Sequence, residues 1–167
     1  GGAAGFDFTR LCWNGDAEGS GTCTGPLVAN TSSANPSGSP STDWACTKDN
    51  HTNLIWSLQT IPGINWNNAT STAGGSPIAA HNAASRCGFA TGWRVPTRRE
   101  LLSIVHHGAY SPAIDGAYFP STVNSWYWTN DSAPNPADAW GVNFFDGDTN
   151  AYLKTGTILV RLVRSGQ

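Results

Sequence analysis

Four cysteines, all within the first 87 residues of a 167-residue chain, place the strongest limit on how this sequence folds. Cys12, Cys23, Cys46 and Cys87 form no C-x-x-C pair, which argues against a zinc site or a thiol redox site. We therefore favour two disulfides over free buried thiols. Of the three possible connectivities we expect Cys12–Cys23 with Cys46–Cys87, because the first pair brackets the glycine-rich stretch CWNGDAEGSGTC. Oxidised cysteines predict an extracellular or cell-surface location.

The composition is typical of a packed, exported domain with few charges. Charged residues make up 12% of the chain and the formal net charge is −2, so no nucleic-acid partner is expected. Aromatic residues make up 11%, which favours a folded, loop-rich domain over a disordered chain. No apolar run approaches the roughly 20 residues of a membrane span, so we expect no membrane insertion. The sequence contains no methionine, so we expect that an export signal or another leading segment preceded Gly1.

The chain is long enough for one domain with a sizeable core, and we expect a single domain over residues 1–167. Residues 1–43 would be an N-terminal extension that includes a surface loop rich in glycine, serine and proline over residues 24–43. Residues 44–167 would be the core of the domain.

Helix-capping residues predict two helices. Ser76 and Pro77 predict the start of the first, because serine caps a helix and proline fits the first helical position. We expect Gly88 to end this helix. The residues expected to line its buried face are Ala80, Ala83, Ala84 and Cys87.

The second helix is predicted within GWRVPTRRELLSIVHH, residues 92–107. Thr97 would be the N-cap, Glu100 would complete a capping box, and Gly108 would end the helix. The expected buried residues are Leu101, Leu102, Ile104 and Val105. Arg98 and Arg99 would occupy the first two helical positions, where the helix dipole disfavours positive charge. We favour pairing of these arginines with carboxylates, and binding of a sulfate or a sugar acid is the alternative.

Five short runs predict strands: NLIWSL (53–58), SWYWTND (125–131), AWGVNFF (139–145), NAYL (150–153) and TILVRLVR (157–164). Asp146-Gly147 is a strong signal for a two-residue hairpin turn. This turn predicts that Trp140, Val142 and Phe144 face the core, opposite Leu153, Ala151 and Thr149. The water-facing side would hold Gly141, Asn143 and Phe145, opposite Tyr152, Asn150 and Asp148.

Several of these segments come in a characteristic order: CTKDNHTNLIWSLQT (46–60), GWRVPTRRELLSIV (92–105), AYFPSTVNSWYWTND (117–131) and VRLVRSGQ (160–167). Together they resemble the Lcl C-terminal domain family, named for a collagen-like bacterial surface adhesin, over roughly residues 44–167. The resemblance implies an α+β fold of the C-type-lectin-like type shared with formylglycine-generating enzymes, with two helices packed on a mostly antiparallel sheet and long loops. It also implies export and binding of host or surface ligands, including sulfated glycans, and scaffold roles for Trp93, Arg94 and Pro96.

We expect no enzymatic activity, no catalytic residues and no cofactor. No cysteine follows Cys87, so the oxidase chemistry of formylglycine-generating enzymes has no nucleophile or copper ligand here. His51, His81, His106 and His107 are not accompanied by a G-x-S-x-G motif. Asp146, Asp148 and Asn150 resemble the start of a calcium loop, but Ala151 and Thr157 stand where an EF-hand requires glycine and glutamate. A calcium site that does not follow the EF-hand pattern remains an alternative at these residues.

The predicted function is recognition of a glycan or a surface protein, as in an adhesin, through the C-terminal strands and loops. The candidate ligand-binding residues are Tyr127, Asn130, Asp131, Asn143, Phe145, Asp148, Asn150 and Tyr152. Rings beside amides suit stacking and hydrogen bonding, whereas Trp126, Trp128 and Trp140 are expected in the core. Two alternatives stay open: a structural subunit of an extracellular fibre or appendage, with this surface buried between copies, and a variable receptor diversified by a retroelement.

Overall fold

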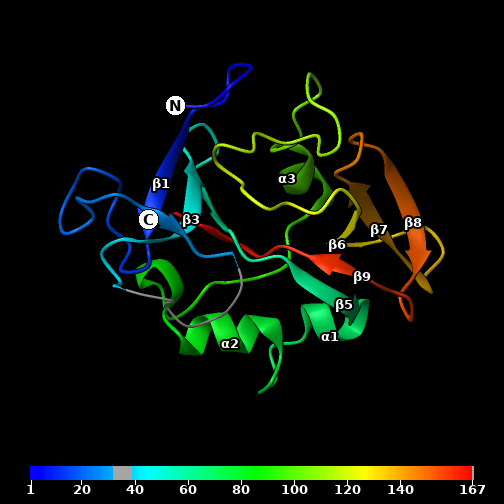
Figure 1. The fold of residues 1–167 in the computed structure, drawn as a ribbon. Helices are drawn as coiled ribbons and strands as arrows, with labels where there is room; N and C mark the ends of the chain where they lie inside the picture. The colour runs from blue at the N-terminus through cyan, green and yellow to red at the C-terminus, as the bar shows by residue number, and fades with distance from the viewer. Residues whose placement is uncertain (32–38, 167) are drawn as a thin grey trace.

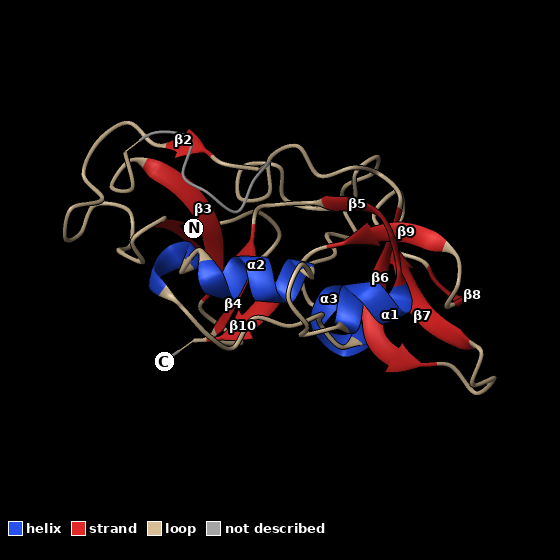
Figure 2. Ribbon diagram, turned by 90° about the horizontal axis from the view of Figure 1, so that it is seen from below, coloured by secondary structure: helices blue, strands red, loops and turns tan. Residues whose placement is uncertain are grey.

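The computed structural model describes residues 1–31 and 39–166, which form two five-stranded sheets with short helices packed against them (Figure 1). Viewed from below, the sheets lie at opposite ends of the molecule (Figure 2). α2 lies beside the first sheet, whereas α1 and α3 lie beside the second. The fold is therefore α+β with mostly antiparallel sheets, as predicted, although the strands divide into two sheets instead of one.

The first sheet has the strand order β1-β3-β4-β10, with β2 pairing in parallel with the start of β3. Its strands are β1 (Phe8–Cys12), β2 (Val28–Ala29), β3 (Asp43–Asp49), β4 (Leu54–Ser57) and β10 (Val163–Ser165). β1 pairs with β3 from Phe8 opposite Asp49 to Cys12 opposite Trp44. The N-terminal extension is thus built into this sheet. Within the loop predicted over residues 24–43, residues 32–38 lie outside the described part of the chain.

The second sheet has the order β5-β9-β6-β7-β8 and is antiparallel except for the β6–β9 pair. Its strands are β5 (Ile61–Asn65), β6 (Trp126–Ser132), β7 (Asp138–Asn143), β8 (Thr149–Leu153) and β9 (Thr157–Val160). The strand predictions for residues 53–58, 125–131, 139–145 and 150–153 are confirmed within a few residues at their ends.

The run over residues 157–164 was predicted as one strand, and this is wrong. It contains β9 in the second sheet and β10 in the first, with Arg161 and Leu162 between them. Arg161 is fully buried, and its Nη1 donates hydrogen bonds to the carbonyls of Ser57 (2.8 Å) and Leu58 (3.2 Å). Its Nη2 donates to the hydroxyl of Thr122 at 2.9 Å. These bonds fix the chain where it passes from one sheet to the other.

The helical segments are α1 (Trp66–Thr70), α2 (Pro77–Ala83), the 3-10 helix η1 (Arg86–Gly88) and α3 (Arg98–Leu102). Ser76 caps α2 as predicted, with its hydroxyl accepting from the N–H of Ala79 at 3.1 Å. The predicted buried face is wrong for Ala80 and Ala83, whereas Cys87 is buried as predicted and Ala84 is half-buried. Ile78 and His81 are buried, whereas Ala80 and Ala83 are exposed.

α2 also ends earlier than predicted, with Ala84 as its C-cap. The backbone φ angle of Cys87 is +55°, in the left-handed region, which interrupts the helical path before Gly88. This turn lets two neighbouring side chains both reach the interior. The fully buried Arg86 guanidinium donates to the carbonyl of Asn30 at 2.9 Å, and Cys87 bonds to Cys46.

The capping box of α3 is confirmed. The hydroxyl of Thr97 accepts from the N–H of Glu100 at 3.2 Å, and Glu100 Oε2 accepts from the N–H of Thr97 at 2.8 Å. The helix ends at Leu102, well before Gly108, so Ile104 and Val105 are buried beyond its end. Leu101 is buried as predicted and Leu102 is half-buried.

Arg98 and Arg99 do occupy the first two positions of α3, but neither guanidinium pairs with a carboxylate within residues 1–31 and 39–166. The prediction of carboxylate pairing is therefore wrong for these side chains. The Arg98 guanidinium lies 4.2 Å from the ring centre of Trp140, a cation–π contact. The carboxylate of Asp131 accepts from the backbone N–H of Arg98 instead. This places a negative charge at the positive end of the helix.

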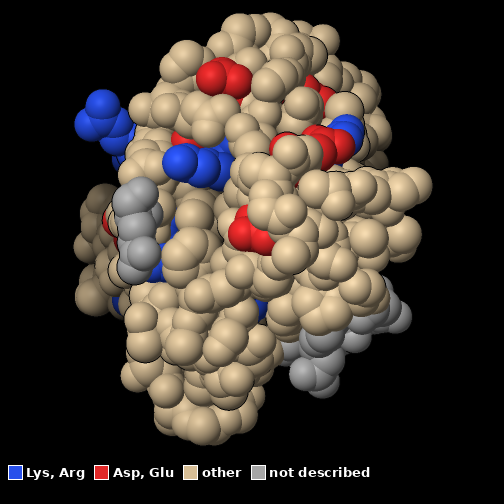
Figure 3. All heavy atoms as spheres, turned by 90° about the vertical axis from the view of Figure 1, so that its left-hand side faces the viewer, with Lys and Arg blue, Asp and Glu red and all other residues tan. Residues whose placement is uncertain are grey.

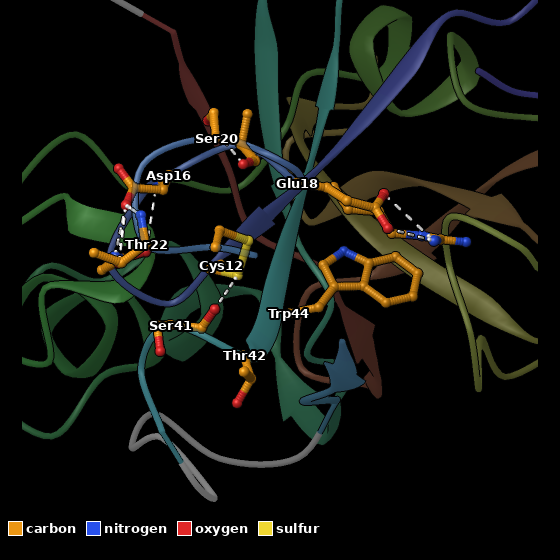
Figure 4. The surroundings of a disulfide bond; sticks show 12 residues. Cys12, Asp16, Glu18, Ser20, Thr22, Ser41, Thr42 and Trp44 are labelled. Carbon is orange, nitrogen blue, oxygen red and sulfur yellow. Dashed lines mark hydrogen bonds and ion pairs between the residues drawn. A yellow bond between two sulfur atoms is a disulfide. The ribbon is translucent and has the colours of Figure 1, made fainter. Parts of the chain in front are cut away.

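Both predicted disulfides, Cys12–Cys23 and Cys46–Cys87, are confirmed. Figure 4 shows the first, which closes a turn beside β1. Inside this turn the Asp16 carboxylate accepts from the backbone N–H of Thr22 at 2.7 Å and from its hydroxyl at 3.0 Å. These bonds lower the pKa of Asp16. The second disulfide ties β3 to η1.

Candidate ligand-binding surface

The hairpin between β7 and β8 turns differently from the prediction, and this sets the geometry of the surface. The ladder ends at Val142 opposite Thr149, and the chain reverses over residues 144–147 instead of at Asp146-Gly147 alone. The cause is Phe144, which is fully buried; its N–H donates to the carbonyl of Ser125 at 2.9 Å, and its carbonyl accepts from the N–H of Ala113 at 2.7 Å. The register is shifted by two residues, so the division of side chains between the two faces of these strands stays as predicted.

One face of the second sheet packs against α3, and this face contains Val142 opposite Tyr127. Tyr127 was predicted to be exposed, and this is wrong, because the structure buries it completely. Its hydroxyl accepts from the N–H of Val123 at 3.1 Å and lies 3.3 Å from the hydroxyl of Thr60. β6 lies inside the sheet with helices on both faces, so the alternation of apolar and polar residues did not reveal which way the Tyr127 side chain points.

The other face of the sheet is covered by α1 at one end only. Trp128 is fully buried there, as predicted, and its indole N–H donates to the carbonyl of Ile64 at 2.8 Å. Trp66 of α1 donates to the carbonyl of Thr129 at 2.8 Å. Beyond these residues the face carries half-buried and exposed side chains.

Trp126 and Tyr152 meet on this open part of the face. They come from β6 and β8, on either side of β7, and their ring centres lie 5.0 Å apart with a tilt of 59°. Gly141 of β7 lies between the two strands, and a Cβ built on it would lie 3.5 Å from the Trp126 ring. The rings meet because glycine leaves the middle strand without a side chain. Trp126 and Trp140 were predicted in the core, but both are only half-buried.

Two amide side chains flank the rings. Asn143 lies directly opposite Trp126, and Asn150 lies directly opposite Gly141. Asn143 is half-buried and Asn150 is exposed. Opposed residues in a ladder share a face, so Trp126, Asn143, Asn150 and Tyr152 form one surface, which we call the aromatic–amide patch.

The remaining predicted site residues lie at the edges of this patch or away from it. Phe145 is 36% exposed and packs edge-on against Tyr110, which is 66% exposed, with ring centres 4.5 Å apart. Asp148 is exposed and accepts through its carbonyl from the N–H of Asn143 at 2.8 Å. Asn130 is exposed, and its N–H donates to the carbonyl of Pro96. Asp131 lies at the start of α3.

The structure therefore brings three of the eight predicted residues into the patch and adds Trp126, which sequence reasoning missed. Sequence reasoning also missed Tyr110, which contacts Phe145. Trp126 could have been found from its place opposite Asn143, but only once the register was known. Tyr110 precedes a loop whose Ser111 N–H bonds to the carbonyl of Phe145 at 2.9 Å. No local pattern marks that long-range contact.

Figure 3 shows the side of the molecule that lies on the left in Figure 1, where the first sheet is, and acidic and basic side chains are scattered there among uncharged ones. Within residues 1–31 and 39–166, no three histidine, cysteine or carboxylate side chains gather in an arrangement that could hold a metal ion. The same residues contain no helix with the length and apolar character needed to cross a membrane.

Two disulfides holding mixed sheets and short helices together define a disulfide-stapled α+β domain, a class that fits an extracellular protein. Residues 45–164 match the model of the Lcl C-terminal domain. This match covers more than half of the sequence, and the chain belongs to the Lcl C-terminal domain family. No curated protein shows significant similarity to the chain.

Proposed function

We propose that this chain is an extracellular recognition domain without enzymatic activity, which binds a glycan or a surface protein through the aromatic–amide patch. The observation that carries the proposal is the contact of Trp126 with Tyr152 across Gly141, with an amide on either side. Rings that are only half-buried, beside polar side chains, bind ligands by stacking and by hydrogen bonds. We also propose a C-type-lectin-like relationship for the fold, on the sequence resemblance alone.

The test is capture on arrays of glycans and surface proteins by the oxidised domain and by its Tyr152→Ala variant. We expect Tyr152→Ala to abolish capture, with a melting temperature close to that of the wild type because the ring is at the surface. Leu153→Ala is the matched control. Leu153 is the next residue of β8, points to the opposite face and is 60% exposed. Unchanged capture by Tyr152→Ala would refute the proposed site.

A structural role in a fibre has one observation in its favour, because β8 is an edge strand and exposes Leu153. Against it, the N–H of Ala151 in the same strand bonds to the side-chain oxygen of Asn150 at 2.9 Å, which removes one donor from the edge. Self-assembly without ligand, followed by size-exclusion chromatography and electron microscopy, would favour this role. The variable-receptor alternative requires a near-copy of the 3′ coding segment beside a reverse-transcriptase gene.

A further inference from the structure

The two amides of the aromatic–amide patch are held in a fixed orientation, with each NH₂ group left to donate. The Asn143 side-chain oxygen accepts from the N–H of Phe145 at 3.0 Å, and that of Asn150 accepts from the N–H of Ala151 at 2.9 Å. An amide NH₂ group cannot accept from an N–H, so these bonds fix the orientation of both side chains. Neither Nδ2 has a hydrogen-bond partner within residues 1–31 and 39–166.

The rings add a further donor. An indole N–H donates only, and that of Trp126 has no partner within the described ranges. The Tyr152 hydroxyl, which can donate or accept, is likewise without a partner in this part of the chain. The patch therefore offers three donor nitrogens and one hydroxyl around a single pair of rings. A ligand bound there must present acceptor oxygens around an apolar face, since donors left unpaired on binding cost affinity.

No positive charge is directed at the patch from the strands that form it. Lys154, which follows β8, donates to the hydroxyl of Ser132 at 2.8 Å and to the carbonyl of Pro136 at 2.9 Å. Its ammonium group also lies 4.3 Å from the ring centre of Trp66. Asp148, which precedes β8, is acidic and exposed. These charges give no partner to a sulfate or a carboxylate, so an anionic ligand is disfavoured.

We infer that the aromatic–amide patch takes an uncharged glycan, whose C–H face stacks on Trp126 and Tyr152 while its oxygens accept from Asn143 and Asn150. This inference rests on the proposed function and narrows it. A sugar ring has an apolar C–H face with oxygen atoms around it. This arrangement matches the patch, in which three donor nitrogens surround a pair of aromatic rings. A polypeptide spreads its carbonyls along an extended chain and matches this arrangement less well. Acetamido sugars suit the patch because a carbonyl oxygen accepts without donating.

The test compares two probes that differ in charge and in acceptors: a tetramer of N-acetylglucosamine and the same tetramer after deacetylation, measured by calorimetry at a mildly acidic pH. We expect the wild type to bind the acetylated tetramer at least about ten-fold more tightly, because an ammonium group cannot accept from the three donor nitrogens of the patch as an acetyl carbonyl can. Equal affinity for the two tetramers, or no binding of either, would overturn the inference.

Asn143→Asp and Asn150→Asp are the decisive variants. A carboxylate still accepts from the N–H of Phe145 or Ala151, so the local structure is kept, but it cannot donate. Each variant should bind the acetylated tetramer at least about ten-fold more weakly and the deacetylated tetramer more tightly than the wild type does. A variant that merely unfolds would lose binding of both tetramers. Wild-type affinity for both tetramers in the two Asp variants would overturn the inference.

The array experiment separates this inference from the proposed function. If Tyr152→Ala abolishes capture of a protein or of a charged glycan while the acetylated tetramer is not bound, the patch is a binding site and the uncharged-glycan inference fails. If Tyr152→Ala captures as the wild type does, the proposed function itself fails.

Discussion

Arg94 binds the capping carboxylate of Glu100 with both of its terminal nitrogens, with Nη1 2.7 Å from Oε2 and Nη2 2.6 Å from Oε1. The same carboxylate accepts from the N–H of Thr97 and so closes the capping box of α3. Arg94 also pairs through its backbone with Val163 of β10. One residue therefore connects the start of a helix that packs on the second sheet, through its side chain, to the last strand of the first sheet, through its backbone.

The first prediction concerns this pair. Burial opposes ionisation of Glu100, but hydrogen bonds from Arg94 and Thr97 outweigh it and lower the pKa of the carboxyl below its ordinary value of 4.5. A lowered folded-state pKa stabilises the protein at neutral pH, and this contribution is lost as the pH falls through that pKa. Glu100→Gln should lower the free energy of unfolding by about 1–2 kcal/mol near pH 7, a modest figure because solvent screens part of the pair.

Urea unfolding of the wild type and Glu100→Gln at about pH 7 and about pH 3 measures this difference. The gap between the two proteins should narrow at the lower pH, because the wild-type carboxylate loses its charge as the pH falls through its lowered pKa. A gap that is equal at both values would show that the charge of Glu100 is irrelevant to the cap.

The second prediction concerns His81, which is buried against Trp93. Its Nε2 lies 3.0 Å from the hydroxyl of Ser57, and its Nδ1 lies 3.0 Å from the carbonyl of Pro77. Burial, together with the nearby charge of Arg86, lowers the pKa of His81 to about 3. Between about 6.5 and about 3 the unfolded chain binds a proton that the folded chain does not, so stability falls as the pH falls through this window.

His81→Gln tests this, because glutamine can accept from Ser57 without ionising. Between about pH 7 and about pH 4.5 the wild type should lose about 2 kcal/mol more unfolding free energy than the variant does. Parallel losses in the two proteins would mean that His81 does not set the acid limit of stability.

The third prediction ranks the two disulfides. Cys46–Cys87 joins residues 41 positions apart, and Cys12–Cys23 joins residues 11 positions apart. Closing a longer loop removes more entropy from the unfolded chain. Replacing Cys46 and Cys87 with alanines should therefore lower the free energy of unfolding by about 4 kcal/mol, and replacing Cys12 and Cys23 should lower it by about 3 kcal/mol. Urea unfolding of the two double variants checks the order. A larger loss from the Cys12–Cys23 pair would contradict it.

The fourth prediction concerns Gly141. A Cβ at this position meets Ile158, the carbonyl of Tyr127 and the Trp126 ring at 3.4–3.5 Å, which is ordinary van der Waals contact. Gly141→Ala should therefore preserve the contact between Trp126 and Tyr152. Gly141→Val adds branches that have no room, so it should separate the rings and cost about 1–3 kcal/mol.

The near-ultraviolet circular dichroism of the two Gly141 variants reports the ring contact, and array capture reports the patch. Capture should survive in Gly141→Ala and be lost in Gly141→Val. If the valine variant captures ligand with an unchanged aromatic spectrum, contact between the rings is not what the patch needs.

Local chemistry was predictable wherever neighbours in sequence are partners in space. Thr97 and Glu100 satisfy each other within one turn, and Cys12 and Cys23 close a short glycine-rich turn, so both were predicted correctly. Ser76 with Pro77 marked the start of α2 for the same reason. Each of these features depends on the residues of a single segment.

The errors arise where distant contacts override a local preference. The Asp146-Gly147 signal predicts a two-residue turn, but burial of Phe144 and its bonds to Ser125 and Ala113 enlarge the loop. TILVRLVR predicts one continuous strand, but Arg161 finds its acceptors on residues 57–60 and on Thr122, which bends the chain into another sheet. Three of the four patch residues, Asn143, Asn150 and Tyr152, were predicted because a register shift of two preserves the faces of β7 and β8. Trp126 was missed because its strand is covered on both sides over part of its length.

The passage of the chain from β9 to β10 brings the C-terminus back to the sheet that contains β1. Both ends of the described chain therefore lie at the side of the molecule formed by the first sheet, and β8 lies at the far side (Figures 1 and 2). A tag or a carrier fused to either end would project away from the aromatic–amide patch. Such fusions can anchor the domain to a sensor chip or a bead with its candidate binding surface turned toward the solution.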